Sequence, residues 1–185
     1  MDVPQSLLGL LTCTMLISPQ AALTPGDADR LFQERLGSYV TLRDDLSRFA
    51  HLPLEPTDER TTTAHRTRVG AALRIARADV PQGNIFSGVV ATAFRRLTAV
   101  AMESPDIRDW VIARAFSSGD VPSARVNGPL PLGAEHDMFP TLLGALPPLP
   151  SGLAYRVLHY DLLIWDVNAN VIVDVLPRTF MVETL

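Results

Sequence analysis

Near its C-terminus the chain carries a proline-rich stretch, Leu146-Pro-Pro-Leu-Pro150, followed by three apolar runs at 153–160, 162–167 and 171–176. These runs are rich in Val, Ile, Tyr and Trp, residue types that favour β-strands. Asp161 and Asn168-Ala-Asn170 separate the runs, and Asn and Asp favour turns because they bond their own backbone. The pattern predicts a small antiparallel β-meander over residues 151–178.

The second run sets a condition on this sheet, since Leu162-Leu-Ile-Trp165 is apolar at every position. A strand that is apolar on both faces has to be central or covered. A sheet this small is also marginal unless its apolar face packs on other elements. The sequence therefore predicts an α+β fold, in which a four-helix N-terminal body carries the β-meander as a single domain over 23–185.

The helical periodicity of apolar residues predicts the four helices within 27–119. Their expected ranges are 27–49, 57–79, 87–102 and 104–119, with Thr57, Ser87 and Ser104 as N-caps. The core-facing side chains expected in the first helix are Leu31, Tyr39, Leu42, Leu46 and Phe49. The second helix carries a row of arginines expected to be a solvated face, or alternatively a patch for an acidic partner: Arg66, Arg68, Arg74 and Arg77. Residues 120–150 are expected to form a linker that wraps the bundle.

Composition narrows the classes of function. The 185 residues are 47% apolar, which is enough for one core without a metal or a disulfide. The net charge of −4 gives no electrostatic reason to expect a nucleic-acid partner. Cys13 is the single cysteine, so no disulfide can form within the chain. The four histidines lack metal-ligand spacing, and we expect Glu135-His136-Asp137 to be a solvated loop, so no cofactor or metal is predicted.

The N-terminal region suggests export. Leu7 to Ile17 is an apolar run of eleven residues, too short for the roughly twenty that a membrane-spanning helix needs. It suits the apolar core of a signal peptide over residues 1–22, although no Arg or Lys precedes it. We therefore expect a periplasmic or secreted protein with no transmembrane span. The alternative is an ordinary apolar helix in a cytoplasmic protein.

Three passages resemble a family of exported bacterial proteins whose activity is uncharacterised. They comprise Tyr39-Val-Thr-Leu42 with Leu52-Pro-Leu-Glu-Pro56, the stretches 72–79 and 82–86, and a C-terminal motif. That motif consists of Leu146-Pro-Pro-Leu-Pro150 with Gly152-Leu-Ala-Tyr-Arg156, then Asp161-Leu-Leu-Ile-Trp-Asp166, then Ala169-Asn-Val-Ile-Val-Asp174. The resemblance implies the architecture and an exported setting, and it implies no catalytic residues.

The candidate binding residues lie in the predicted strands: Tyr155, Arg156, Asp161 and Asp166. If Asp161, Asp166 and Asp174 shared a face, they would form a small acidic site beside Tyr155 and Arg156. More simply, these aspartates cap turns or pair with arginines.

Three functional hypotheses follow from these residues. The leading one is a non-enzymatic exported protein that binds a partner protein or a cell-envelope component, because no polar constellation converges. The first alternative is a small-molecule-binding domain, with a pocket between helices and sheet lined by Tyr39, Phe94, Trp110 and Trp165. The second alternative is an enzyme of unrecognised type, which would gather Tyr155, Arg156 and Asp166 in one cleft.

Overall fold

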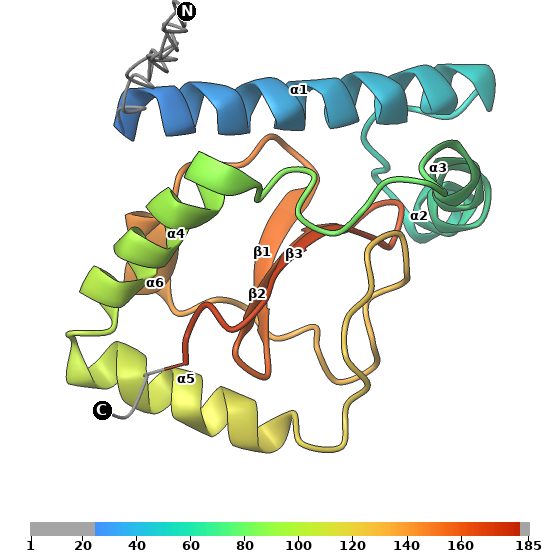
Figure 1. Ribbon diagram of the computed structural model, residues 1–185. Helices are drawn as coiled ribbons and strands as arrows, with labels where there is room; N and C mark the ends of the chain where they lie inside the picture. The colour runs from blue at the N-terminus through green and yellow to red at the C-terminus, as the bar shows by residue number, and fades with distance from the viewer. Residues whose placement is uncertain (1–24, 182–185) are drawn as a thin grey trace, which may run out of the picture.

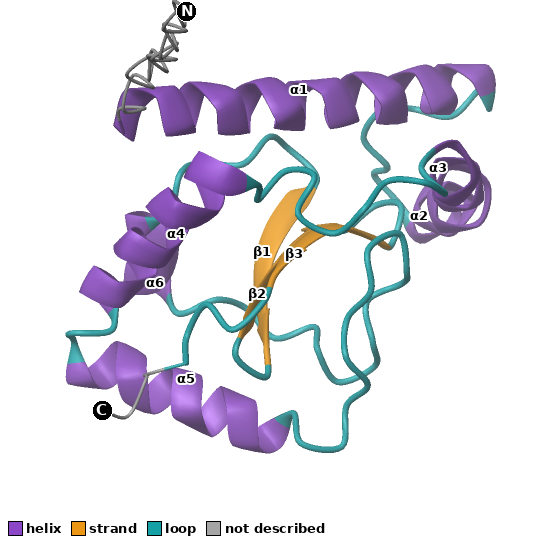
Figure 2. Ribbon diagram, in the orientation of Figure 1, coloured by secondary structure: helices purple, strands orange, loops and turns teal. Residues whose placement is uncertain are grey.

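The structure is a computed structural model, and it describes residues 25–181. The helices are α1 (Pro25–Phe49), α2 (Glu59–Ala64), the π-helical η1 (His65–Val69), α3 (Gly70–Ala76), α4 (Gly88–Ala101), α5 (Pro105–Ser117) and α6 (Pro140–Ala145). The strands are β1 (Leu153–Leu158), β2 (Asp161–Asp166) and β3 (Val171–Leu176). Figures 1 and 2 show the helices arranged around the sheet, with α1 above it, α5 below it and α4 and α6 to the left. The α+β class is confirmed, whereas the predicted leader over 1–22 lies outside the described residues.

The three strands form one antiparallel sheet in the order β1-β2-β3. Strand β2 is therefore central, as its unbroken apolar run predicts. Tyr155 of β1 lies opposite Ile164 of β2, and a bulge at Ile164/Trp165 shifts the register with β3. His159 in the first turn and Asn170 in the second have positive φ values of 52° and 50°. Asp161, expected in a turn, is instead the first residue of β2.

The two faces of the sheet are covered by different parts of the chain. One face contributes Tyr155, Leu162 and Ile164 to a main core shared with the helices. The other face, which includes Leu163 and Trp165, packs under the segment 121–134. The first part of the predicted linker thus covers the sheet, while Met138, Leu142 and Leu146 from its later part enter the main core. This double cover explains why an apolar β2 is stable.

Helix α1 lies on the main core by a stripe shifted from the predicted one. Its buried positions are Ala28, Phe32, Leu36, Tyr39, Arg43 and Ser47, which recur at helical spacing. Phe32 meets Phe94 of α4 with ring centroids 4.8 Å apart. Phe49, expected in the core, is 86% exposed, so that prediction is wrong. The prediction left out Arg43 and Ser47 because they are polar, and it also missed Phe32 and Leu36, although both fit the helical spacing.

The predicted second helix is divided into three pieces. Asp58, rather than Thr57, caps it, because its Oδ1 accepts from the backbone N of Thr61 at 2.7 Å. The π-helical turn η1 brings His65 and Val69 to the buried side. Gly70 then lies directly on the β2–β3 turn, since an added Cβ would stand 2.4 Å from the carbonyl oxygen of Ala169.

The arginine row of this helical region is only partly a solvated face. Arg66 and Arg68 are exposed, as predicted. Arg77 is only 5% exposed and donates to the carbonyl of Val173 at 2.8 Å, which corrects the prediction for this residue. Arg74 donates to the carbonyl of Asn170 at 2.9 Å. The last two arginines therefore fasten α3 to the sheet.

Candidate functional site

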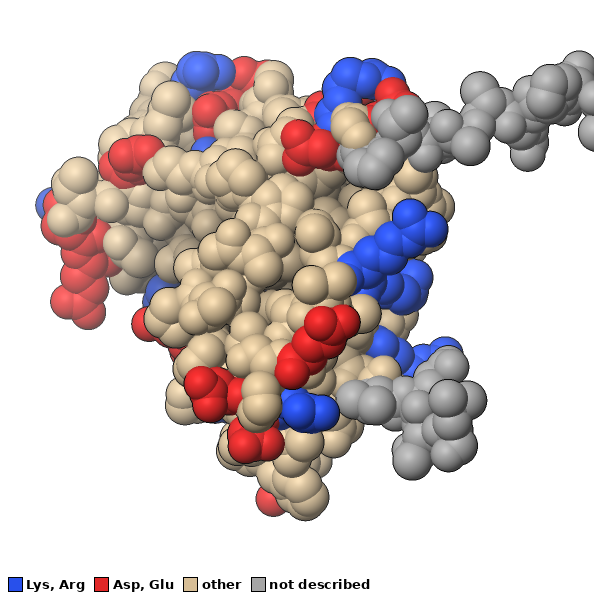
Figure 3. Space-filling view, turned by 90° about the vertical axis from the view of Figure 1, so that its left-hand side faces the viewer, with Lys and Arg blue, Asp and Glu red and all other residues tan. Residues whose placement is uncertain are grey.

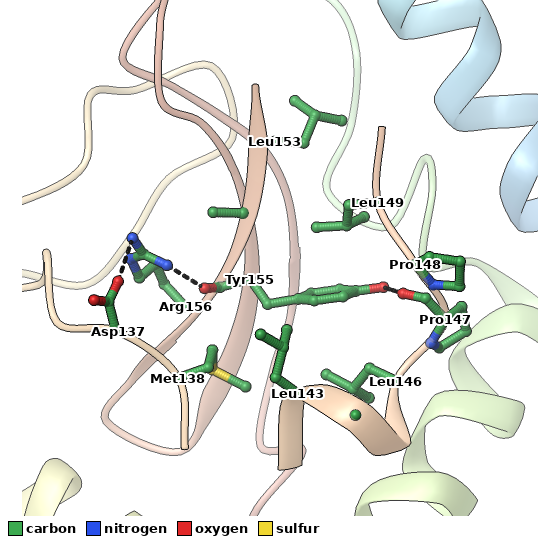
Figure 4. A pocket seen from close by; sticks show the side chains of 12 residues that line it. Asp137, Met138, Leu143, Leu146, Pro147, Pro148, Leu149, Leu153, Tyr155 and Arg156 are labelled. Atoms are coloured by element: carbon green, nitrogen blue, oxygen red, sulfur yellow. Dashed lines mark hydrogen bonds and ion pairs between the residues drawn. The ribbon is translucent and has the colours of Figure 1, made fainter. Parts of the chain in front are cut away.

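A cavity of about 620 Å³ lies against the outer edge of β1 (Figure 4). Its lining consists of Leu153–Arg156 of β1, Leu146–Leu149, Leu143 and Gly144 of α6, and Asp137 with Met138. We call this cavity the β1 groove. Its walls come from one local stretch of chain, because α6, the proline-rich segment and β1 follow one another in sequence.

The proline-rich segment forms a wall that cannot pair with β1. Proline lacks a backbone N–H, so Pro147 and Pro148 cannot complete a strand ladder. Their carbonyl groups are used elsewhere: Pro147 accepts from the Tyr155 hydroxyl at 2.9 Å and Pro148 accepts from Nε2 of Gln33 at 3.2 Å. These two bonds fasten the segment to β1 and to α1. The edge of β1 is left open as a result.

The outer edge of β1 presents backbone groups without strand partners. The N of Val167 donates to the carbonyl of Gly152 at 2.9 Å. From this pair onward, an antiparallel ladder alternates, so Leu153, Tyr155 and Val157 direct their backbone groups away from β2. The N–H of Leu153 is taken by the carbonyl of Pro150 at 3.2 Å, so the open part of the edge begins at Tyr155. Among the described residues, no carbonyl outside the sheet accepts from the Tyr155 N–H. The carbonyl of Tyr155 is covered only by its neighbour's side chain, since Nη1 of Arg156 donates to it at 2.8 Å.

The surroundings of the groove are largely uncharged. No charged residue occurs between Met138 and Tyr155. Figure 3, which views the molecule from the α4 and α6 side of Figure 1, shows a broad uncharged area with charged side chains around its margins. Leu143, which lines the groove, is half exposed. The groove therefore favours apolar groups over charged ones along most of its length.

Arg156 is the exception in this apolar lining. Nη2 of Arg156 lies 3.2 Å from Oδ1 of Asp137, whose side chain is 95% exposed, and the guanidinium lies over the Trp165 ring at 5.2 Å. Its Nε is buried with no hydrogen-bond partner among the described residues. Burial lowers the pKa of Arg156, and the Asp137 carboxylate offsets part of that effect. In Figure 4 the Tyr155 ring extends to one side of β1 and Arg156 to the other.

Asp166, another candidate, does not line the groove. It is fully buried and accepts from the Tyr39 hydroxyl at 2.9 Å and from the N of Ala169 at 2.8 Å, with Nη1 of Arg43 at 3.7 Å. Burial raises the pKa of Asp166, although the Ala169 bond and the charge of Arg43 act in the opposite direction. Burial and the adjacent carboxylate also raise the pKa of Tyr39. This cluster fastens the β2–β3 turn to α1.

The three aspartates of the strands lie in separate places and do not form an acidic site. Asp161 accepts from the N of Arg178 at 2.8 Å. Asp174 accepts from the backbone N of Gly83 and Ile85, both at 2.7 Å, and of Phe86 at 2.8 Å. The sequence does contain a clue to this role, because a carboxylate within an apolar strand requires buried partners. Of the four candidate residues, the structure brings only Tyr155 and Arg156 together.

The four aromatic residues expected around a pocket do not line the groove. Tyr39 and Phe94 are buried in the main core, and Trp165 packs on the other face of the sheet. Trp110 packs on Phe139, with ring centroids 6.1 Å apart. The sequence reasoning missed the actual walls of the groove at α6 and 146–149. The prolines directly before an edge strand are the feature that could have revealed them.

Residues 25–181 contain neither a candidate metal site nor a candidate membrane-spanning helix. No group of three or more His, Cys, Asp or Glu side chains in this range could hold a metal ion. No helix in it is long and apolar enough to cross a bilayer. The chain was also compared with protein-family models, curated proteins and solved structures, and nothing in these three sets matches it. The resemblance to an exported family therefore stays a prediction.

Proposed function

We propose that this chain is a non-enzymatic binding protein whose β1 groove takes up an extended segment of a partner protein. The observation that carries the proposal is the open edge of β1, where the N–H of Tyr155, which has no acceptor within residues 25–181, lies at a largely apolar cavity of about 620 Å³. Strand addition at such an edge gives affinity through the backbone and specificity through alternate side chains. We further propose that the protein acts in the periplasm or outside the cell, as its N-terminal sequence suggests.

The dimensions of the groove suit a short strand. The groove is lined by consecutive β1 residues from Leu153 to Arg156, a stretch that spans about 13 Å at roughly 3.3 Å per residue. A segment of about four residues could therefore lie along the edge. Its side chains would point alternately towards the wall formed by Leu146 and Leu149 and towards Arg156. The edge would gain hydrogen bonds that intramolecular contacts leave unmade.

The proline-rich segment is less suited to be the recognised element. Extended proline-rich ligands present their pyrrolidine rings and carbonyl groups to an aromatic groove on another protein. Here the carbonyls of Pro147 and Pro148 are already bonded to Tyr155 and Gln33. The segment thus acts as a fixed wall, and the groove beside it is the surface offered to a partner.

A matched pair of glycine substitutions tests the proposal. Gly144 lines the groove and Gly37 lies on α1, and an added Cβ at either one meets nothing within 4 Å. Gly144→Phe should fill the groove while leaving the fold intact, and Gly37→Phe adds the same ring to a helix that does not line the groove. We would pan a peptide-display library against the wild-type protein and measure the enriched peptides against both variants by fluorescence anisotropy.

Gly144→Phe should weaken peptide binding by more than about tenfold, as loss of a central contact does. Gly37→Phe should leave it unchanged. The amide of Tyr155, followed by NMR hydrogen exchange, should become protected when peptide is bound. A library without enriched peptides, or peptides that bind Gly144→Phe normally, would refute the proposal.

A small apolar molecule is the alternative occupant of the same groove, because its volume lies within the usual range for ligand pockets. Such a molecule cannot pair with the strand edge through a backbone of its own. Its binding should also be blocked in Gly144→Phe, where the Phe ring fills the groove. It would not protect the Tyr155 amide from hydrogen exchange. The exchange measurement therefore distinguishes the two occupants.

A further inference from the structure

Arg156 and Asp137 are the two charged residues that line the β1 groove. Their exposures are very unequal, since the Arg156 side chain is 12% exposed and the Asp137 side chain is 95% exposed. The guanidinium is thus held in a mostly buried position against Trp165, whereas its carboxylate partner is surrounded by water. A solvated carboxylate compensates a buried cation only weakly. The cation is therefore available to a better-placed anion.

The hydrogen-bonding capacity of Arg156 is only partly used. Arginine has five N–H donors arranged in a planar fork. Nη1 donates to the carbonyl of Tyr155 and Nη2 faces Asp137, while the buried Nε has no partner within the described residues. The bond from Nη1 covers a carbonyl on the open strand edge. An added strand would replace that bond and release the donor.

The register of β1 places this guanidinium correctly for a neighbouring strand. Arg156 lies between Tyr155 and Val157, the residues whose backbone groups face outward. In an added strand, the residue opposite Arg156 would lie on the same face with its Cβ about 4.5–5.5 Å away. A carboxylate at that position could take the released Nη1 together with Nη2, in place of Asp137, in a forked pair. The residues on either side would point to the opposite face, towards the apolar wall of Leu146 and Leu149.

We propose that Arg156 selects the partner segment by pairing with an acidic side chain that is flanked by apolar residues. This inference rests on the proposed function and names the chemistry of the segment. The recognised pattern is apolar–acidic–apolar, with the acidic residue opposite Arg156. Asp137 holds the guanidinium in the free protein and yields it to the carboxylate of the partner.

The test uses display libraries with both peptide ends blocked, so that any carboxylate comes from a side chain. Parallel selections use the wild type, Arg156→Gln, Arg156→Lys and Arg68→Gln. The last variant removes the same charge from an exposed site in η1, between α2 and α3 and across the molecule from α6 in Figure 1. Circular dichroism and thermal unfolding establish that each variant is folded.

Wild type and Arg68→Gln should enrich Glu or Asp at one fixed position between apolar residues, and Arg156→Gln should lose that preference. Replacing the acidic residue of a selected peptide by its amide should weaken binding to the wild type by about tenfold or more, as for close charge pairs elsewhere. The same replacement should have little effect on Arg156→Gln, which completes a double-mutant cycle. Arg156→Lys should keep part of the preference because it keeps the charge but not the fork.

Each contrary outcome has a distinct meaning. Groove-dependent peptides without an acidic position would overturn this inference and leave the proposed function standing. If Arg156→Gln bound the same peptides more tightly, with unchanged preference, Arg156 would serve only to protect the edge from pairing. Absence of any peptide that depends on an open groove would overturn the proposed function itself.

Discussion

Asp174 is a buried carboxylate in β3 whose loss should destabilise the whole domain. Its oxygens receive the backbone N–H groups of Gly83, Ile85 and Phe86, which form the loop before α4. Hydrogen bonds to a charged group contribute about 1.5–3 kcal/mol each. Its Oδ1 also accepts from the backbone N of Val175 at 2.8 Å, so substitution by alanine takes the acceptor from four N–H groups, although it also removes the cost of burying the charge. We expect Asp174→Ala to lower the free energy of unfolding by about 3–4 kcal/mol, as loss of one partner in a buried pair does.

The asparagine variant gives a graded comparison. Oδ1 of Asp174 accepts from Gly83 and Oδ2 accepts from both Ile85 and Phe86. Asparagine keeps only one of these two acceptor oxygens and carries an NH₂ group in place of the other. Its NH₂ group would then face a backbone donor, and we expect a loss of about 2 kcal/mol. Asp161→Ala is the matched control, because Asp161 is more exposed and accepts one backbone bond from Arg178.

Urea unfolding followed by tryptophan fluorescence measures these changes. With a slope of about 1–3 kcal/mol per molar urea, Asp174→Ala should move the midpoint by at least about 1 M. Asp161→Ala should move it much less. A loss below about 1 kcal/mol for Asp174→Ala, or a loss equal to that of the control, would refute the inferred role of this carboxylate.

Gly70→Ala should destabilise the protein by about 1–3 kcal/mol, since the new Cβ would approach the Ala169 carbonyl oxygen to 2.4 Å. Gly37→Ala, where the Cβ meets nothing within 4 Å, should instead stabilise it by up to about 1 kcal/mol in thermal unfolding. Burial raises the folded-state pKa of Asp166 above 3.8, so the unfolded state loses its proton first as pH rises. Relative to Asp166→Asn, the free energy of unfolding of the wild type should therefore fall as the pH rises from about 4 through the raised pKa. The same pH profile of the free energy of unfolding in both proteins would contradict this. Tyr155→Phe removes the bond to Pro147 and should cost about 1 kcal/mol in urea unfolding while also weakening peptide binding.

The sequence predicts the elements of this fold well and their contacts less well. Apolar runs and turn residues locate the three strands, and the unbroken run of β2 correctly predicts its central place. Periodicity fails in α1, where Arg43 is buried with its Nη1 3.7 Å from Asp166, and Ser47 is buried with its hydroxyl bonded to the carbonyl of Arg43. Single-chain patterns assign such side chains to water, since burial of a polar group is decided by a partner distant in sequence.

The candidate residues show the same division between local and distant information. Tyr155 and Arg156 are adjacent in β1 and both line the groove, although their side chains extend to opposite sides of the strand. Asp166 also lies in the meander, so the sequence groups it with them, but its partners in the structure are Tyr39 and Ala169. Which residues share a pocket depends on tertiary contacts that neither spacing nor residue type specifies.

The β1 groove is nevertheless encoded largely by one short stretch of sequence. Leu146-Pro-Pro-Leu-Pro150 forms a wall that cannot join the sheet, and Gly152-Leu-Ala-Tyr-Arg156 supplies the open edge beside it. Gly152 has a φ of 79°, a conformation that turns the chain sharply between these two parts. Wall, turn and edge are thus contiguous, and the Tyr155–Pro147 bond sets the separation of the edge from its wall. A groove built in this way depends on the rest of the fold mainly for its wall at α6 and for the helices that hold the sheet in place.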